Sequence, residues 1–133
     1  MMADGPVIGV AGLGTMGLGI AQVFAQAGFS VLATDAKGAP RGSAPARLAQ
    51  ALDARVAAGK LEQTDRDATL ARLRIVDRVE ALAPAALVIE AIAEDAAAKR
   101  ALFAALDGVL PPDAVLATNT SSLSVAALAQ GLA

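Results

Sequence analysis

The chain has 133 residues, with 11 basic and 13 acidic side chains and with neither histidine nor cysteine. This length suits one domain, and the formal charge of −2 offers no large basic surface for nucleic acid or anionic lipid. Disulfides and thiolate chemistry are excluded, and without histidine the commonest general base and metal ligand are missing, so we expect no metal site.

Neither the N-terminal residues nor the hydropathy of the chain indicates contact with a membrane. Asp4 stands near the N-terminus, where a signal peptide would carry basic residues. Hydrophobic residues make up 56% of the chain, yet no run of about 18 apolar residues is free of charges and helix breakers. We therefore expect a cytoplasmic protein without membrane contact.

The first elements form a unit of strand, glycine turn, helix and strand. The apolar run Val7–Ala11 predicts a buried strand that ends in a glycine-rich turn at residues 12–17. Apolar residues three and four apart then predict a helix, which Gly28 ends as a C-cap glycine. Residues 29–34 predict a second strand, and Asp35 follows it directly.

The next segment is rich in turn-forming residues. Residues 37–43, with their glycine, proline and serine, predict a loop, and residues 45–58 predict a helix with leucines four apart. Thr64 and Asp67 predict a capping box for a short helix at residues 65–73.

The remaining elements again alternate between apolar runs and helical patterns. They are a third strand at 75–76, a helical turn at Val79–Leu82, a fourth strand at 87–91, a helix at 95–109, a fifth strand at 114–117, a polar turn at 118–122 and a last helix at 125–132. Strands that alternate with helices predict a parallel sheet covered on both faces. The sequence therefore predicts an α/β fold: a single Rossmann-type domain with a doubly wound, mostly parallel sheet.

The glycine turn carries a chemical prediction. Gly12 lets the chain reverse after the strand, Gly14 lets a pyrophosphate approach the backbone, and Gly17 lets the helix lie close to the strand. Asp35, 18 residues after Gly17, can accept hydrogen bonds from both adenosine ribose hydroxyls and would repel the 2′-phosphate of NADP. Lys37 nearby softens this preference. The pattern in its context predicts NAD(H) binding, although G-x-G-x-x-G alone arises by chance and Asp35 alone is a common turn residue.

The sequence resembles the N-terminal domain of the 3-hydroxyacyl-CoA dehydrogenases. The resemblance rests on Gly-Leu-Gly-Thr-Met-Gly at 12–17, Val-Ile-Glu-Ala-Ile-Ala-Glu at 88–94 with the following Lys99, Gly-Lys-Leu at 59–61, and Ala-Thr-Asn-Thr-Ser-Ser-Leu at 117–123. These motifs occur in the family's order over nearly the whole chain. The resemblance implies an enzyme of fatty-acid β-oxidation that oxidises the 3-hydroxyl of an acyl-CoA to a ketone and passes hydride to NAD.

The resemblance also implies roles for individual residues. Ser121 would lie near the nicotinamide and the substrate hydroxyl, Asn119 would support that turn, and Lys60 would lie where CoA approaches. The implied cofactor contacts are Gly12, Leu13, Gly14, Thr15, Met16, Gly17, Asp35, Ala91, Glu94 and Lys99. Three of these residues also have a purely structural interpretation: Glu94 as a capping residue, Lys99 as a helix-surface lysine and Ser121 as a turn serine.

The sequence departs from the family in the Gly/Pro/Ser content of residues 37–45 and, more importantly, in what it lacks. The family's catalytic histidine, its glutamate partner and the helical C-terminal domain have no counterpart among these 133 residues. We therefore expect a fragment that binds NAD(H) without turnover, whose acyl-CoA substrate would need the missing domain. An apolar patch at the carboxyl edge of the sheet, where that domain would pack, predicts self-association into a homo-oligomer.

Two other interpretations remain open at this point. β-Hydroxyacid dehydrogenases also begin with Gly-Leu-Gly-x-Met-Gly, but Asp35 and the Asn-Thr-Ser-Ser turn argue against them. A non-enzymatic module that senses NAD(H) fits the absence of histidine, although no partner surface is evident.

Overall fold

The computed structural model describes residues 5–93 and 95–118. The helix predicted at 125–132 and all but the first residue of the turn predicted at 118–122 lie outside the described residues. Within the described part of the chain, none of the helices has the length and apolarity that crossing a membrane requires.

Five parallel strands form one sheet in the order β3-β2-β1-β4-β5. The strands are β1 (Val7–Ala11), β2 (Val31–Thr34), β3 (Leu73–Ile75), β4 (Ala85–Glu90) and β5 (Val115–Thr118). The order reverses between β1 and β4, and at such a switch point the loops diverge and leave a crevice at the carboxyl ends of the strands. The Rossmann-type α/β prediction is confirmed.

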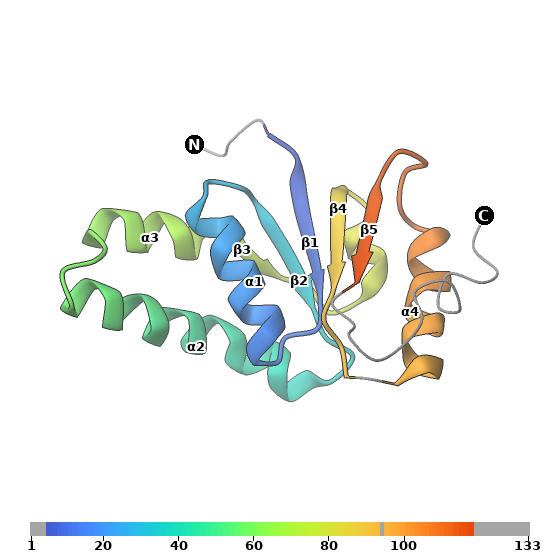
Figure 1. The fold of residues 1–133 in the computed structure, drawn as a ribbon, viewed down its shortest axis with the longest axis horizontal. Helices are drawn as coiled ribbons and strands as arrows, with labels where there is room; N and C mark the ends of the chain where they lie inside the picture. Colours follow the sequence, from blue (N-terminus) through green and yellow to red (C-terminus); the bar gives the residue numbers. More distant parts are fainter. Residues whose placement is uncertain (1–4, 94, 119–133) are drawn as a thin grey trace.

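Helices cover both faces of this sheet. α1 (Thr15–Gln26), α2 (Gly38–Ala57) and α3 (Gln63–Arg72) lie on one face, and α4 (Ala96–Asp107) lies on the other (Figure 1). The short 3-10 helix η1 (Val79–Leu82) packs on the same side as α4. Each face therefore has a core of its own. One is built on Ile8 and Val10, and the other on Ala11 and Val88.

The loop predicted at residues 37–43 is wrong, because α2 already begins at Gly38. Pro40 lies in the first turn, where the missing N–H has no partner in a helix anyway. Pro45 lies further inside and removes one backbone hydrogen bond. Ala44 and Leu48 are buried, and Arg41 and Arg47 hydrogen-bond to main-chain carbonyls outside the helix. These contacts outweigh the weak helix propensity of the segment.

The other predicted boundaries agree with the structure or differ by at most two residues. α3 begins at Gln63 with Glu62 as its N-cap, so the capping box predicted from Thr64 is wrong. The turn between α2 and α3 is fixed instead by Arg66, which bridges Asp53 and Asp67 at 2.9 and 3.0 Å. The hydrogen bond to Asp53, and then that to Asp67, raises the pKa of Arg66 above its ordinary value.

Candidate functional site

The glycine turn between β1 and α1 is so tightly packed that two of its glycines have no substitute. Gly12 has a φ of +112°, and a Cβ there would lie 2.5 Å from the carbonyl oxygen of Ala91. A Cβ on Gly17 would lie 1.8 Å from the carbonyl oxygen of Gly12. The first turn of α1 is therefore pressed against the end of β1, which is the close approach that the sequence predicts for Gly17.

Gly14 differs from its neighbours, because a Cβ there would meet no described atom within 4 Å. Its φ of −71° and ψ of −170° are open to any residue, so neither backbone nor packing requires glycine. It directly precedes α1, whose first N–H groups have no partners inside the helix. The first turn of α1 contains no acidic residue, so the N-terminal end of the helix keeps its partial positive charge for an anion.

The carboxylate of Asp35 is held by main-chain donors on both of its oxygens. Leu13 N–H donates to Oδ2 at 2.8 Å, and Lys37 N–H donates to Oδ1 at 2.9 Å. The end of β2 is thereby tied to the glycine turn and to the start of α2. A carboxylate has about four lone-pair positions, so these two bonds leave capacity for further donors.

Arg47 of α2 holds the same residue, Leu13, through its carbonyl group. Its Nη2 donates to the carbonyl oxygen of Leu13 at 2.6 Å and to that of Pro40 at 3.1 Å, while its Nε donates to Ser43 Oγ at 3.0 Å. The Leu13 residue thus gives its N–H to Asp35 and its carbonyl to Arg47, and its side chain is fully buried. Leu13 contributes to the site through its backbone.

Substitution of Arg47 by methionine is expected to lower the free energy of unfolding by about 1–3 kcal/mol, because the buried carbonyl of Leu13 loses a charged donor. Urea unfolding followed by circular dichroism measures this loss. Arg55→Met, which removes an exposed arginine further along the same helix, is the matched control and should stay within about 0.5 kcal/mol of the parent. Equal effects of the two substitutions would refute the role of Arg47.

A cleft of about 420 Å³ opens beside this turn at the carboxyl edge of the sheet. Its floor is formed by Gly12 and Asp35, and one wall by small residues of α4 such as Ala98 and Ala101. Arg41 and Arg78 lie at its rim. Ligands of open α/β sheets bind in such crevices.

A buried ion pair lies next to the cleft. Glu90 ends β4, Lys99 lies in α4, and both side chains are 0% exposed. Lys99 Nζ donates to Glu90 Oε1 and Oε2, at 2.9 Å each, and Ile92 N–H donates to Oε2 at 2.6 Å. Thr118 at the end of β5 also hydrogen-bonds to Oε1. The pair thus joins the carboxyl ends of β4 and β5 to α4.

Sequence reasoning missed this pair, although it offered a signal. Glu90 is the single charged residue of an otherwise apolar strand, and such a carboxylate must find a partner if the strand is buried. The interpretation of Lys99 as a helix-surface lysine is wrong, because the side chain is buried. Arg41 was also missed, since the sequence predicts a loop at residues 37–43, and so was the contact between Arg47 and the carbonyl of Leu13.

The structure brings most of the predicted cofactor residues together. Residues 12–17 and Asp35 lie at one edge, and Ala91 lies beside them, with its N–H bonded to the carbonyl of Ala11 at 2.8 Å. Lys60 is not part of this cluster, because it follows α2 at its far end, about 30 Å from Gly38 for a 20-residue helix. Glu94, Asn119 and Ser121 lie outside the described residues.

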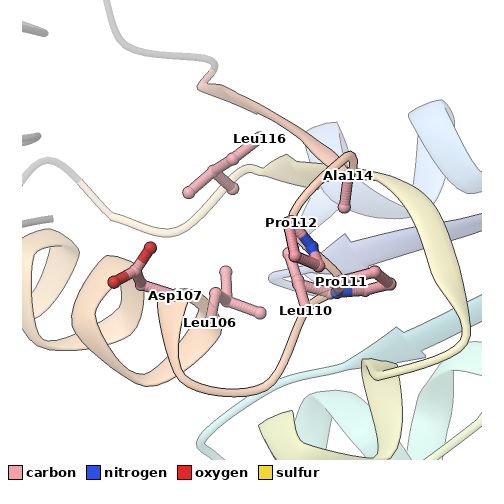
Figure 2. Close-up of a pocket in the computed structure, with 7 residues that line it drawn as sticks. All are labelled: Leu106, Asp107, Leu110, Pro111, Pro112, Ala114 and Leu116. Atoms are coloured by element: carbon pink, nitrogen blue, oxygen red, sulfur yellow. The ribbon is translucent and has the colours of Figure 1, made fainter. Parts of the chain in front are cut away.

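Two further hollows are separate from this cleft. One, of about 440 Å³, lies between the end of α4 and the start of β5, and Asp107 is the only charged residue among those that line it (Figure 2). The other follows the outer face of α1, where Met16 and Val23 are 59% and 66% exposed. Neither hollow includes Gly12 or Asp35.

Known proteins share this architecture and sequence. Residues 7–133 match the family described as 3-hydroxyacyl-CoA dehydrogenase, NAD binding domain. The 3-hydroxyadipyl-CoA dehydrogenase of Escherichia coli K12 is 44% identical over 129 residues, which are 97% of this chain and 27% of that protein. The 3-hydroxybutyryl-CoA dehydrogenase of Mycobacterium tuberculosis H37Rv is 42% identical over 119 residues, which are 89% of this chain and 42% of that protein.

A solved structure agrees with these matches. The crystal structure of 3-hydroxybutyryl-CoA dehydrogenase from Escherichia coli K12 superposes with a TM-score of 0.93 at 42% identity, over 98% of this chain and 28% of that one. The chain thus spans well under half the length of the relatives it matches. It belongs to the 3-hydroxyacyl-CoA dehydrogenase family and corresponds to the NAD-binding domain of that family.

Proposed function

We propose that the chain is the cofactor half of an enzyme that oxidises (S)-3-hydroxyacyl-CoA to 3-oxoacyl-CoA, with NAD as the hydride acceptor. The observation that carries the proposal is the pairing of the glycine turn with Asp35, whose carboxylate is tied to Leu13 N–H beside an open cleft. A carboxylate in that place suits a ribose with two free hydroxyls. The membership in an NAD-binding family supports the same cofactor.

The residues fit NAD on physical grounds. The N–H groups that begin α1 at Thr15 and Met16 would hold the pyrophosphate, and the open space at Gly14 leaves room for it. Asp35 would accept hydrogen bonds from the adenosine ribose. Ala91, Glu94 and Lys99 would line the cofactor beyond β4. Lys99 is buried and already bonds to Glu90, so its ammonium would influence the cofactor through its charge and not through direct contact.

NAD, when bound, takes the hydride that leaves C3 of the substrate. We infer that Ser121 and Asn119 act next to that carbon, because β5 ends at Thr118, directly before them in the sequence, at the carboxyl edge of the sheet. A base must accept the hydroxyl proton as the hydride leaves, and these 133 residues contain no histidine. We therefore propose that the base and the acyl-CoA site come from outside these residues, which form a single domain.

The partners and location follow from the same proposal. The acyl-CoA would approach along helices α2 and α3, near Lys60. Relatives are named for 3-hydroxybutyryl-CoA and 3-hydroxyadipyl-CoA, and we infer an acyl group within this range of size and polarity. The exposed apolar side chains of α1, Met16 and Val23, support self-association or a contact with the rest of the enzyme. We infer a cytoplasmic location, and the net charge of −2 supports the absence of a nucleic-acid partner.

A titration of the 133-residue chain with NADH, followed by calorimetry, tests the cofactor site. We expect NADH to bind more tightly than NADPH, and Asp35→Ala to remove most of that difference, because the carboxylate both accepts from the ribose and repels a 2′-phosphate. Oxidation of 3-hydroxybutyryl-CoA by the same chain is expected to be undetectable. Binding of neither cofactor at millimolar concentration would contradict the proposal, and measurable turnover would contradict the inferred external base.

A further inference from the structure

We propose that Asp35 alone holds this site to NADH, and that Arg41 is poised to bind a phosphate on the adenosine 2′-oxygen once that carboxylate is removed. The inference rests on the cofactor site proposed above and concerns its specificity. Arg41 and Arg78 line the same cleft as Asp35, although neither follows β2 directly.

Arg41 is anchored in a way that survives changes to the Asp35 side chain. It lies in the first turn of α2, and its Nη1 donates to the main-chain carbonyl of Asp35 at 2.9 Å. Any residue at position 35 offers the same carbonyl. A guanidinium has five N–H donors in a planar fork, which leaves it able to bind a phosphate in bidentate fashion.

The Asp35 carboxylate is hydrogen-bonded by main-chain N–H groups. Its two oxygens accept from Leu13 N–H and Lys37 N–H. The 20-residue helix α2 begins at Gly38, three residues after Asp35, and it has no acidic residue in its first turn. These groups favour an anion, and the carboxylate of Asp35 is the anion that they now hold.

Arg78 adds a second, looser cation. Its side chain is 71% exposed, and its contact with Asp77 is long, at 3.9 Å between Nε and Oδ1. An exposed pair of this kind contributes little and leaves the guanidinium able to turn toward a ligand. The charged residues that line the cleft are thus Asp35 and Asp77 against Arg41 and Arg78. Loss of Asp35 alone shifts the balance strongly toward phosphate.

Binding of 2′,5′-ADP and 5′-AMP to the 133-residue chain tests the inference, because the two ligands differ only in the 2′-phosphate and neither contains nicotinamide. For Asp35→Asn, which keeps the shape of the side chain, we expect the preference for 2′,5′-ADP over 5′-AMP to rise roughly tenfold to a hundredfold, the range for a gained charge-assisted hydrogen bond. Adding Arg41→Gln should abolish that gain, whereas adding Arg41→Lys should retain part of it.

The matched control is Asp35→Asn with Arg55→Gln, which has the same net charge but alters an exposed residue near the far end of α2. This variant should keep the full gain. If Asp35→Asn fails to fold, Arg41→Gln in the parent chain decides, since it leaves the two hydrogen bonds of the Asp35 carboxylate intact and should weaken 2′,5′-ADP more than 5′-AMP.

The outcomes separate this inference from the proposed function. A parent chain that binds NADH and 5′-AMP, together with an Arg41→Gln substitution that affects both adenosine ligands equally, overturns the role of Arg41 and leaves the NAD site standing. A parent chain that binds neither NADH nor 5′-AMP overturns the proposed function, and this inference with it.

Discussion

Substitution of Lys99 by methionine is expected to lower the free energy of unfolding by about 3–5 kcal/mol, the usual cost of removing one partner of a buried ion pair. The carboxylate of Glu90 would keep Ile92 N–H and Thr118 as partners but would lose the cation that compensates its charge. Its side chain is 0% exposed, so water cannot replace the ammonium without a local opening of the structure. Urea unfolding followed by circular dichroism measures the effect.

Two further variants show whether the cost comes from the unpaired charge. Arg100→Met removes a cation from the neighbouring, exposed position of α4 and should change stability by no more than about 0.5 kcal/mol. Glu90→Gln combined with Lys99→Met should recover most of the loss, because the amide can still accept from Ile92 N–H and can donate to Thr118. A double variant as unstable as Lys99→Met would show that shape, rather than charge, governs this site.

The ion pair has a place in the cofactor site as well as in the core. In the register of the sheet Glu90 lies opposite both Ala11 and Thr118, and these three residues end their strands. Ala11 leads into the glycine turn, and Thr118 leads into Asn119. The pair therefore fixes the end of β4, which lies beside β1 at the proposed cofactor site, and loosening the pair should weaken NADH binding as well as lower the stability of the fold.

The sequence was sufficient for the architecture because the relevant signals are local. The boundaries of β1 and of the helical turn at Val79–Leu82 agree with the structure, since each is a short apolar or turn-forming run between breakers. Strands alternating with helices then leave few topologies for a chain of this length. Asp95, predicted to begin the fourth long helix, is its N-cap and accepts from Ala98 N–H at 3.1 Å.

Contacts between distant residues were not predictable in this way. The first turns of α2 read as a loop because glycine, proline and serine disfavour helix locally, while Arg41 and Arg47 stabilise it through carbonyls that belong to Asp35 and Leu13. Lys99 was assigned to the cofactor or to the helix surface. Its burial depends on the ion pair with Glu90, which lies in a different element, at the end of β4. The helical periodicity of α4 carries no information about that contact.

Gly14→Ala is expected to leave the fold intact and to weaken NADH binding roughly tenfold to a hundredfold. The fold should tolerate the methyl group, because the backbone conformation suits alanine and no described atom lies within 4 Å of the new Cβ. The methyl group would occupy the space through which the pyrophosphate approaches the first N–H groups of α1. Loss of one or two charge-assisted hydrogen bonds accounts for an effect of that order.

Gly19→Ala supplies the matched control, because it adds the same methyl group to the exposed side of α1. It should bind NADH like the parent and gain about 0.5–1 kcal/mol of stability, since glycine inside a helix is less favourable than alanine. Adenosine is the second control. It lacks the pyrophosphate, so its affinity should be the same in Gly14→Ala and in the parent.

These two controls make the result decisive for the anion site. Gly17→Ala cannot serve the purpose, because its Cβ would overlap the carbonyl oxygen of Gly12 and would disrupt the turn itself. A Gly14→Ala protein that binds NADH as tightly as the parent would place the pyrophosphate elsewhere. A protein that loses NADH and adenosine alike would indicate a disturbed turn, and only the selective loss of NADH assigns the N-terminus of α1 to the phosphates.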